Sequence, residues 1–209
     1  MKINEIFYSI QGEGKDTGLP FIFIRTTGCN LRCTYCDTTY AYIKGKEMDI
    51  CKVLDAIKRY TCKNVCITGG EPLIQNQTLS LIDALIENKY LVSIETNGSI
   101  DIKDISQKNN VSISLDIKCP SSTMHEQMIY ENLLYLTKKD QLKFIIKNYT
   151  DFEYATKIIK TTTIQAPIFF QPVWGTNIND LASWILQDKL NVRLGVQLHK
   201  IIWGNKKGV

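Results

Sequence analysis

The sequence predicts an α/β fold in which a parallel sheet carries helices on its outer face, as one domain spanning residues 1–209. Short apolar runs rich in β-branched and aromatic residues alternate with helical stretches of about ten residues, which is the pattern of right-handed βαβ units. A chain of 209 residues buries a sizeable core and fits the usual size of one domain. Polar residues directly follow several apolar runs, where the strands of such a sheet end.

Three strands and one helix are expected in the first third of the chain. Lys2–Ser9 alternates apolar and polar residues as an edge strand does, whereas Pro20–Thr26 and Asn64–Thr68 are apolar enough to be buried strands. Between them, Asp49–Tyr60 has apolar residues at positions 50, 53, 54 and 57, which form one stripe of a helix. The first residue of this helix suits the N-cap, and Cys51 is expected at a core position.

The alternation continues to the end of the chain. Helices are expected at residues 78–88, 128–137, 151–160 and 179–187, and strands at residues 90–96, 111–117, 141–146, 167–170 and 192–198. Because the carboxyl ends of parallel strands meet at one edge of a sheet, we expect a site at that edge. The polar residues at these strand ends are Thr68, Glu95, Asp116, Lys118 and Gln171.

Three cysteines stand close together after the second strand, in a segment where Cys29, Cys33 and Cys36 have the spacing C-x3-C-x2-C. Soft thiolates in such a group suit zinc, copper(I) or an iron–sulfur cluster. A closed zinc site or an all-protein cluster takes four ligands, so three cysteines leave one iron open for a small molecule. A zinc site with a distant fourth ligand, or three unrelated thiols, are the alternatives.

Two glycine-containing turns accompany the cysteines. In residues 11–14 (QGEG) two glycines flank a carboxylate and let the backbone approach a ligand closely, with a plain turn as the alternative. In residues 69–72 (GGEP) two glycines end a strand and expose backbone groups, and Glu71 adds an acceptor for an ammonium group.

Polar residues also flank the cysteine segment. Arg25 lies near the end of a strand, where its guanidinium suits a carboxylate held by two parallel hydrogen bonds; a surface salt bridge is the alternative. Asp37 and Thr38 directly follow the last cysteine of the motif. Their short oxygen side chains suit either a helix cap or a hard cation such as Mg²⁺.

Composition and charge exclude several classes of protein. The net charge of +4 is mild and spread over helical segments and the end of the chain, so we expect no nucleic-acid groove. No apolar run reaches the ~20 residues that span a bilayer. Seven cysteines without a signal peptide predict a reducing cytoplasm rather than a disulfide framework. Cys62 and Cys66 are not expected to form a second cluster, because Cys66 lies within an apolar strand and suits packing there.

The cysteine spacing followed by Gly-Gly-Glu-Pro resembles the radical S-adenosylmethionine (SAM) superfamily. In that superfamily three cysteines hold a [4Fe–4S] cluster, and the amino and carboxylate groups of SAM chelate the fourth iron. Further segments resemble one family within it, the 7-carboxy-7-deazaguanine synthases: YSIQGEG at residues 8–14, RTTGCNLRC at 25–33, CDT at 36–38, TGGEP at 68–72, ETNG at 95–98 and QLHK at 197–200. The resemblance covers nearly the whole chain.

That resemblance implies a partial (β/α)6 barrel, usually a homodimer, which works in queuosine and deazapurine biosynthesis. The family consists of lyases that convert 6-carboxy-5,6,7,8-tetrahydropterin into 7-carboxy-7-deazaguanine with release of ammonia. Its implied cofactors are the [4Fe–4S] cluster, SAM and Mg²⁺, and an electron donor such as flavodoxin or ferredoxin reduces the cluster. The pterin is a small-molecule substrate, and neither nucleic acid nor membrane is implied as a partner.

Carried onto this sequence, the resemblance implies three groups of site residues and no acid or base catalyst. The metal ligands are Cys29, Cys33 and Cys36 for the cluster and Thr38 for Mg²⁺. The SAM-binding residues are Tyr35, Gly70, Glu71, Asp116, Ile117, Lys118, Gln171, Pro172, Val173 and Trp174. The substrate-binding residues are Ile10, Gln11, Gly12, Arg25, Thr68 and the carboxylate of Val209. Residues 116–122 (DIKCPSS) depart from the SPKPPSS of many members, so Lys118 is a firmer assignment than Asp116.

Two other functions fit part of the same pattern. Another small radical SAM enzyme, such as a glycyl-radical activase, would act on a protein partner; the QGEG segment and Arg25 favour a small acidic heterocycle instead. A zinc-binding module without catalysis would contain zinc but neither iron nor sulfide after anaerobic purification.

Overall fold

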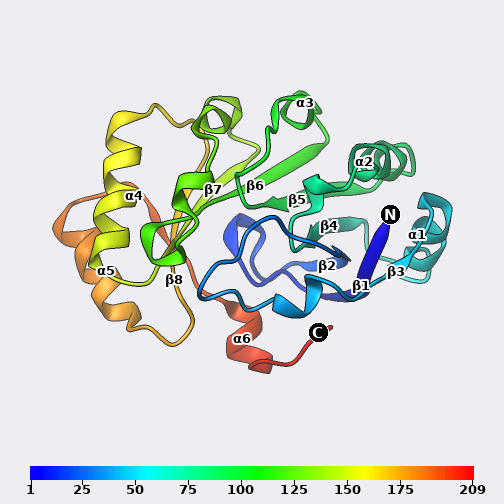
Figure 1. Cartoon of the computed structure of the whole chain (residues 1–209), viewed down its shortest axis with the longest axis horizontal. Coiled ribbons are helices and arrows are strands. Elements are labelled where there is room, and N and C mark those ends of the chain that lie inside the picture. Colours follow the sequence, from blue (N-terminus) through cyan, green and yellow to red (C-terminus); the bar gives the residue numbers. More distant parts are fainter.

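The computed structural model describes residues 1–209 and contains one sheet of nine strands, in the order β3-β1-β2-β4-β5-β6-β7-β8-β9 (Figure 1). Neighbouring strands from β2 onward are parallel, whereas β1 pairs antiparallel with β2 and β3. The strands are β1 Lys2–Ile10, β2 Pro20–Thr26, β3 Lys46–Glu47, β4 Asn64–Gly69, β5 Leu91–Thr96, β6 Val111–Ile117, β7 Gln141–Ile146, β8 Ile168–Pro172 and β9 Arg193–Leu194. The two ends of the sheet do not pair with each other, so the barrel is partial, as the sequence predicts.

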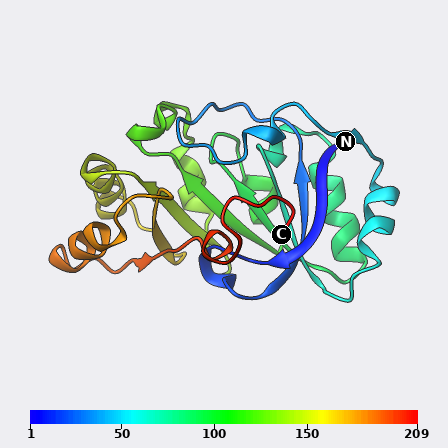
Figure 2. The same cartoon turned by 90° about the horizontal axis from the view of Figure 1, so that it is seen from below.

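Helices cover the outer face of the sheet. They are α1 Ile50–Ile57, α2 Thr78–Glu87, α3 Lys103–Ser106, α4 Tyr149–Thr161, α5 Ile178–Gln187 and α6 Leu198–Trp203. The first five lie around the outside of the curved sheet, and α6 lies with the C-terminus on its open side (Figures 1 and 2). No helix combines the length and the apolar character that crossing a membrane would require.

The core lies between the sheet and the outer helices, where 33 buried residues form one cluster. At its α4 and α5 end, aromatic rings join two strands to two helices. The Phe152 ring meets Phe170 edge-on with centroids 5.9 Å apart and lies 5.6 Å from the Trp184 ring. Phe170 meets Phe144 edge-on at 5.6 Å. These contacts fix α4 and α5 on β7 and β8.

Most predicted elements are confirmed, and the predicted N-cap of α1 is present. The Asp49 carboxylate accepts a hydrogen bond of 2.8 Å from the backbone N–H of Lys52. This start places Val53 and Ile57 on the buried face of α1. Cys51 then lies on the exposed face, so its predicted core position is wrong.

Three predictions about local structure are also wrong. Residues 128–137 form a short 3₁₀ segment, Tyr130–Tyr135, instead of an α-helix. Buried side chains tie this segment to its surroundings: Asn132 donates to the Ile100 carbonyl of the loop before α3, and Asp140 accepts from the N–H of Thr137. The last strand contains only Arg193–Leu194, and the chain turns into α6, where the Leu198 N–H donates to the Gly12 carbonyl at 2.9 Å. The edge strand next to β1 is β3, which the sequence analysis missed.

We predict that Phe152→Ala lowers the free energy of unfolding by about 3–5 kcal/mol, because it leaves a cavity between α4 and β8. Urea unfolding of the metal-free protein measures the effect. Leu186→Ala on α5 is the matched control, since Leu186 is 76% exposed and its truncation should change stability by less than about 0.5 kcal/mol. Equal effects of the two substitutions would contradict this account of the core.

Candidate active site

A cavity of about 590 Å³ opens at the carboxyl ends of the parallel strands. The loop that carries the three cysteines lines it together with strand-end residues, among them Thr68 of β4, Asp116 of β6 and Gln171 of β8. All predicted site residues except Glu71 and Ile117 contribute to its lining. The topology therefore gathers at one edge of the sheet the side chains that the sequence singled out.

The cysteine loop is held against the loop that follows β6. Thr34 donates from its hydroxyl to the Ser121 carbonyl at 2.7 Å and from its N–H to the Ser122 carbonyl at 3.3 Å. Ser121 in turn donates its N–H to the buried Asp151 carboxylate at the start of α4, at 2.9 Å. The segment between Cys33 and Cys36 is therefore fixed to the body of the protein.

The thiols of Cys29, Cys33 and Cys36 are free, half-buried and face the same cavity. Burial raises the pKa of Cys29 and of Cys33, so positive charge from a bound metal group would be needed to keep them as thiolates. No three His, Cys, Asp or Glu side chains converge on a point that could hold a single ion. A four-iron cluster places each cysteine on a different iron, so three thiols spaced around one cavity fit such a cluster better than a zinc ion.

Glu71 of the GGEP turn is fully buried and does not itself line the cavity. Its carboxylate accepts hydrogen bonds from the Thr96 hydroxyl at 2.9 Å, the Asn97 N–H at 2.7 Å and the Leu73 N–H at 3.0 Å. Burial raises the pKa of Glu71 to about 7 against the opposing effect of these donors. The side chain thus fastens the turn to the end of β5, and direct contact with SAM remains a prediction.

The rest of the turn is shaped by close packing. The Glu71 N–H donates to the Gly28 carbonyl at 2.8 Å, which brings the GGEP turn against the start of the cysteine loop. A side chain at Gly70 would overlap that carbonyl and lie 2.7 Å from Cys29 Cβ, so only glycine fits. Asn97 completes the junction, because its side-chain amide donates to Asn30 Oδ1 at 3.2 Å and lies 3.8 Å from Cys29 Sγ.

Several buried polar atoms of the predicted SAM side have no partner in the protein. They are the Tyr35 hydroxyl, Oδ1 of Asp116 and both side-chain polar atoms of Gln171. The second Asp116 oxygen pairs with the Lys118 ammonium at 3.0 Å. Buried polar atoms that line a cavity without partners suit a polar ligand. Ile117 is the exception, since its side chain is buried in the core and leaves only the main chain for a ligand.

Arg25 lies on the predicted substrate side and forms an ion pair, one of its two predicted roles, while binding of a ligand carboxylate stays a prediction. Its Nε donates to Glu5 Oε1 at 2.7 Å, and the guanidinium also lines the cavity. The Tyr40 hydroxyl donates to the same Glu5 oxygen at 2.9 Å. Arg25 is therefore held in place by Glu5 and lies where it can meet a ligand carboxylate.

The C-terminal segment crosses the open side of the sheet and packs beside Gly12 and Thr38 (Figure 2). A side chain at Gly12 would overlap the His199 ring. Thr38 donates to Asp37 Oδ1 at 2.9 Å, and Asp37 Oδ2 pairs with Lys200 of α6 at 2.8 Å. The C-terminal residue, Val209, also lines the cavity.

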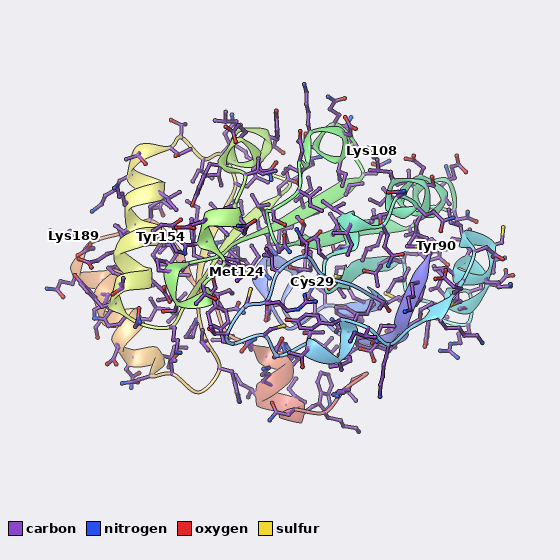
Figure 3. All side chains as sticks on the ribbon, in the orientation of Figure 1. Cys29, Tyr90, Lys108, Met124, Tyr154 and Lys189 are labelled. Atoms are coloured by element: carbon purple, nitrogen blue, oxygen red, sulfur yellow. The ribbon has the colours of Figure 1, made fainter.

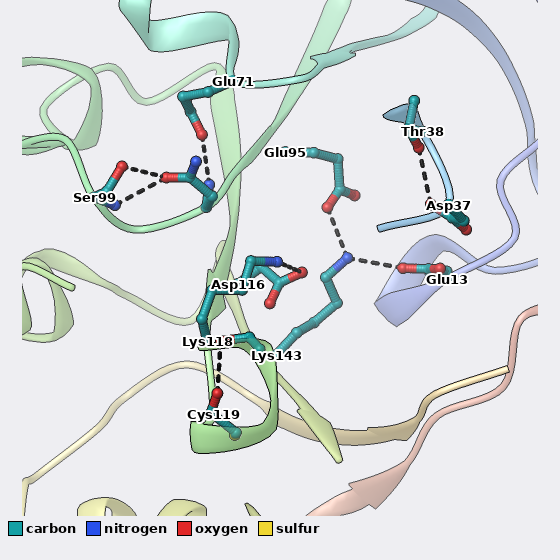
Figure 4. A network of polar contacts seen from close by, with 12 residues as sticks. Glu13, Asp37, Thr38, Glu71, Glu95, Ser99, Asp116, Lys118, Cys119 and Lys143 are labelled. Carbon is teal, nitrogen blue, oxygen red and sulfur yellow. Dashed lines mark hydrogen bonds and ion pairs between the residues drawn. The ribbon is translucent and has the colours of Figure 1, made fainter. Parts of the chain in front are cut away.

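The sequence analysis missed a buried ion-pair group on the cavity wall. The Lys143 ammonium lies 2.9 Å from Glu13 Oε2 and 2.8 Å from Glu95 Oε2 (Figure 4). Glu95 was expected at the site as a strand-end residue, but Glu13 was considered only as part of a turn and Lys143 was not considered. A signal for Lys143 was present, because a charged residue in the middle of an apolar strand is rarely buried unless it is paired.

Comparison with known proteins assigns the class. The sequence matches the radical SAM superfamily over residues 23–150, the part that contains the cysteine loop and the GGEP turn. Members of this superfamily use a [4Fe–4S] cluster and SAM. The fold alone is shared with SuiB of Streptococcus suis bound to S-adenosylmethionine, which is 16% identical with a TM-score of 0.59 over 82% of this chain and 48% of that one.

Closer relatives assign the family. A 7-carboxy-7-deazaguanine synthase of Thermoplasma acidophilum is 41% identical over all of both chains. One of Methanospirillum hungatei is 43% identical over 97% of this chain and 85% of its own. The crystal structure of QueE from Escherichia coli is 27% identical, with a TM-score of 0.80 over 95% of this chain and 94% of that one. The chain belongs to the 7-carboxy-7-deazaguanine synthase family.

We predict that Glu71→Gln removes a pH dependence of stability. Between pH 4.5, the ordinary pKa of this carboxyl, and about 7, its pKa in the fold, the folded state binds more protons than the unfolded state. The free energy of unfolding of the wild type relative to the variant therefore falls as pH rises through this range, by about 3 kcal/mol.

Urea unfolding of the metal-free proteins at several pH values between 4.5 and 8 measures this difference. Glu126→Gln, on the surface near η5 (His125–Gln127), serves as a control that should leave the pH dependence unchanged. A difference between wild type and Glu71→Gln that stays constant with pH would contradict the role of burial at Glu71.

Proposed function

We propose that this protein converts 6-carboxy-5,6,7,8-tetrahydropterin into 7-carboxy-7-deazaguanine with release of ammonia; the names of its relatives support the product, and the family resemblance implies the substrate and the ammonia. The observation that carries the proposal is the shared cavity. One cavity holds the cysteine loop, the unpartnered polar atoms of the predicted SAM side and Arg25 with the QGEG turn. Two small molecules and a cluster can therefore meet in one enclosed space.

Each part of the cavity has a proposed role. Cys29, Cys33 and Cys36 hold the cluster, which together with SAM supplies the radical that removes a hydrogen atom from the substrate. Gly70 gives backbone groups to SAM, and Lys118 holds the carboxylate side of the ligand. The protein fixes the reactants in position and keeps water out.

The remaining SAM contacts are proposed for the strand-end side chains and the segment after β8. Asp116 and Gln171 offer unpartnered buried polar atoms to the ligand, and Pro172, Val173 and Trp174 line the adenosyl part of the cavity. Tyr35 and Ile117 contribute through their main chains. Glu71 acts by fixing Gly70, which follows from its hydrogen bonds to the end of β5.

The substrate is proposed to bind between β1, β2 and the C-terminal segment. Arg25 binds the pterin carboxylate, because Glu5 holds its Nε and leaves the other guanidinium nitrogens for a ligand. The Ile10–Gly12 segment and Thr68 lie along the same wall of the cavity. The carboxylate of Val209, which lines the cavity, contacts the ring of the bound pterin.

Mg²⁺ is proposed to bind at Thr38. The Thr38 hydroxyl and the neighbouring Asp37 carboxylate give oxygen ligands of the kind that this ion takes, while the ion keeps water and substrate oxygens as its other ligands. There Mg²⁺ would orient the substrate carboxylate and stabilise negative charge during rearrangement.

The domain organisation, electron donor, oligomeric state and cellular location are also proposed. Residues 1–209 act as one domain, which is supported by one sheet and one main core. An electron donor such as flavodoxin or ferredoxin reduces the cluster, the chain works as a homodimer in the cytoplasm, and the product enters queuosine or another deazapurine. A glycyl-radical activase is not favoured, because the curated relatives are 7-carboxy-7-deazaguanine synthases.

We predict that anaerobically reconstituted protein forms 7-carboxy-7-deazaguanine from the pterin, SAM, a reductant and Mg²⁺, as measured by product mass. Cys33→Ala should abolish the product and the cluster absorbance, whereas Cys51→Ala, at an exposed cysteine of α1, should retain both. SAM cleavage without product would reject the substrate, and zinc binding without iron would reject the cluster.

We predict that Thr38→Ala raises the Mg²⁺ concentration for half-maximal activity at least about tenfold, the cost of one lost ligand to a hard cation. Thr39→Ala, at the exposed neighbouring threonine, should leave it unchanged. Titration of Mg²⁺ into chelator-treated enzyme measures both variants. The same half-maximal concentration in Thr38→Ala and wild type would exclude Thr38 as a ligand.

A further inference from the structure

Lys143 is a buried cation whose place in the structure calls for an explanation. It lies in the middle of β7 between two fully buried apolar residues, Leu142 and Phe144, and its side chain is only 4% exposed. Lysine is almost never buried to this extent unless it is paired. Lys143 also lines the active-site cavity, so its burial concerns the site as well as the core.

The ammonium of Lys143 joins two carboxylates that come from distant parts of the chain. Its Nζ lies 2.9 Å from Glu13, in the QGEG turn after β1, and 2.8 Å from Glu95, near the end of β5. Figure 4 shows the ammonium between the two side chains. Gln197 donates to the other Glu13 oxygen at 2.9 Å, whereas Glu95 Oε1 makes no hydrogen bond to the protein. One carboxylate oxygen is thus left for a ligand in the cavity.

The group carries more negative than positive charge. One ammonium faces two carboxylates, so one negative charge is not balanced within the group. The other lysines that line the cavity, Lys118 and Lys200, are already paired with Asp116 at 3.0 Å and Asp37 at 2.8 Å. Ionised carboxylates only accept hydrogen bonds, so the ligand that meets this wall must present N–H or O–H donors.

At Arg25 the ligand must instead present hydrogen-bond acceptors, because the guanidinium offers donors that suit a carboxylate. A molecule with a carboxylate on one side and ring N–H groups on another complements both walls. A carboxylated tetrahydropterin has this pattern, with N–H groups on both of its rings.

We propose that Lys143 is a positioning residue for the substrate, because its ammonium binds the Glu13 and Glu95 carboxylates and directs them at the ring N–H groups of the pterin. This inference rests on the proposed function. Lys143 itself does not touch the reacting atoms. It determines which hydrogen-bonding pattern the cavity accepts.

A purely structural role of Lys143 would not require a charged side chain at this position. Replacing a buried ion group by apolar side chains of similar size often leaves stability unchanged or raises it, so packing alone gives no reason for a lysine at this position. Two carboxylates that must be held side by side next to a ligand do give such a reason. Without the ammonium, they would lose the donor that they share and would repel each other.

Two variants test the proposal on the reconstituted holoenzyme. Lys143→Met removes the ammonium, and the double variant Lys143→Met/Glu95→Gln also removes one carboxylate and so keeps the net charge of the group. We expect both to raise KM for the pterin about 10- to 100-fold, the effect of losing a hydrogen bond to a charged group. KM for SAM and the cluster absorbance should stay within about twofold of the wild type, because the Lys143 ammonium makes its ion pairs with Glu13 and Glu95 and none with the proposed SAM-binding residues.

The single variant leaves an additional buried carboxylate without a partner and could misfold for that reason. The double variant leaves no additional unpaired charge, so it tests the proposal even if the single variant does not fold. Lys108→Met is the matched control: Lys108 pairs with Asp83 at the rim of the molecule, far from Cys29, and should keep wild-type KM values (Figure 3). Wild-type KM for the pterin in the double variant, or an equal rise of KM for SAM, would overturn the proposal. Lack of pterin turnover by the wild type would instead reject the proposed function.

Discussion

The buried Glu71 carboxylate holds together the parts of the active site that come from different segments. The carboxylate accepts hydrogen bonds from the Thr96 hydroxyl, the Asn97 N–H and the Leu73 N–H. The backbone N–H of Glu71 donates to the Gly28 carbonyl. Through these bonds the ends of β4 and β5 and the start of the cysteine loop share one anchor. A cluster, SAM and substrate need fixed relative positions, and a fully hydrogen-bonded buried group provides such rigidity.

Charged side chains are distributed unevenly around the cavity, so its different walls suit different parts of the ligands. Paired charges surround it: Lys118 with Asp116, Lys200 with Asp37, and Lys143 with two glutamates. Each pair leaves atoms free toward the cavity or fixes a loop beside it. Burial opposes the charge on Glu13, but the nearby Lys143 and a hydrogen bond from Gln197 lower its pKa to about 2, so this wall stays anionic over the working pH range.

Local sequence patterns were sufficient to predict most strands of the sheet and the position of the cysteine loop. The bounds of β2, β6 and β7 agree with the predicted ranges, because each strand is an apolar run with a clear polar or glycine boundary. The segment at residues 128–137 was predicted incorrectly as a helix. Its apolar spacing is helical, but the Asn132 side chain is drawn to the Ile100 carbonyl of another loop, and Asp140 takes the Thr137 N–H that a helix would use.

The α/β class, the cysteine loop and the strand-end residues could be predicted from the sequence alone, because periodicity and short motifs report on local geometry and burial. Which charged groups meet depends on the three-dimensional fold. Lys143 and Glu13 are 130 positions apart, and Glu13 and Gln197 are 184 apart, so no local pattern links them. The three-dimensional fold also buried the Glu71 side chain outside the lining of the cavity and brought α6 and the C-terminus to its open side. These outcomes depend on long-range packing, which fixes the partners of a buried charge once the sheet has formed.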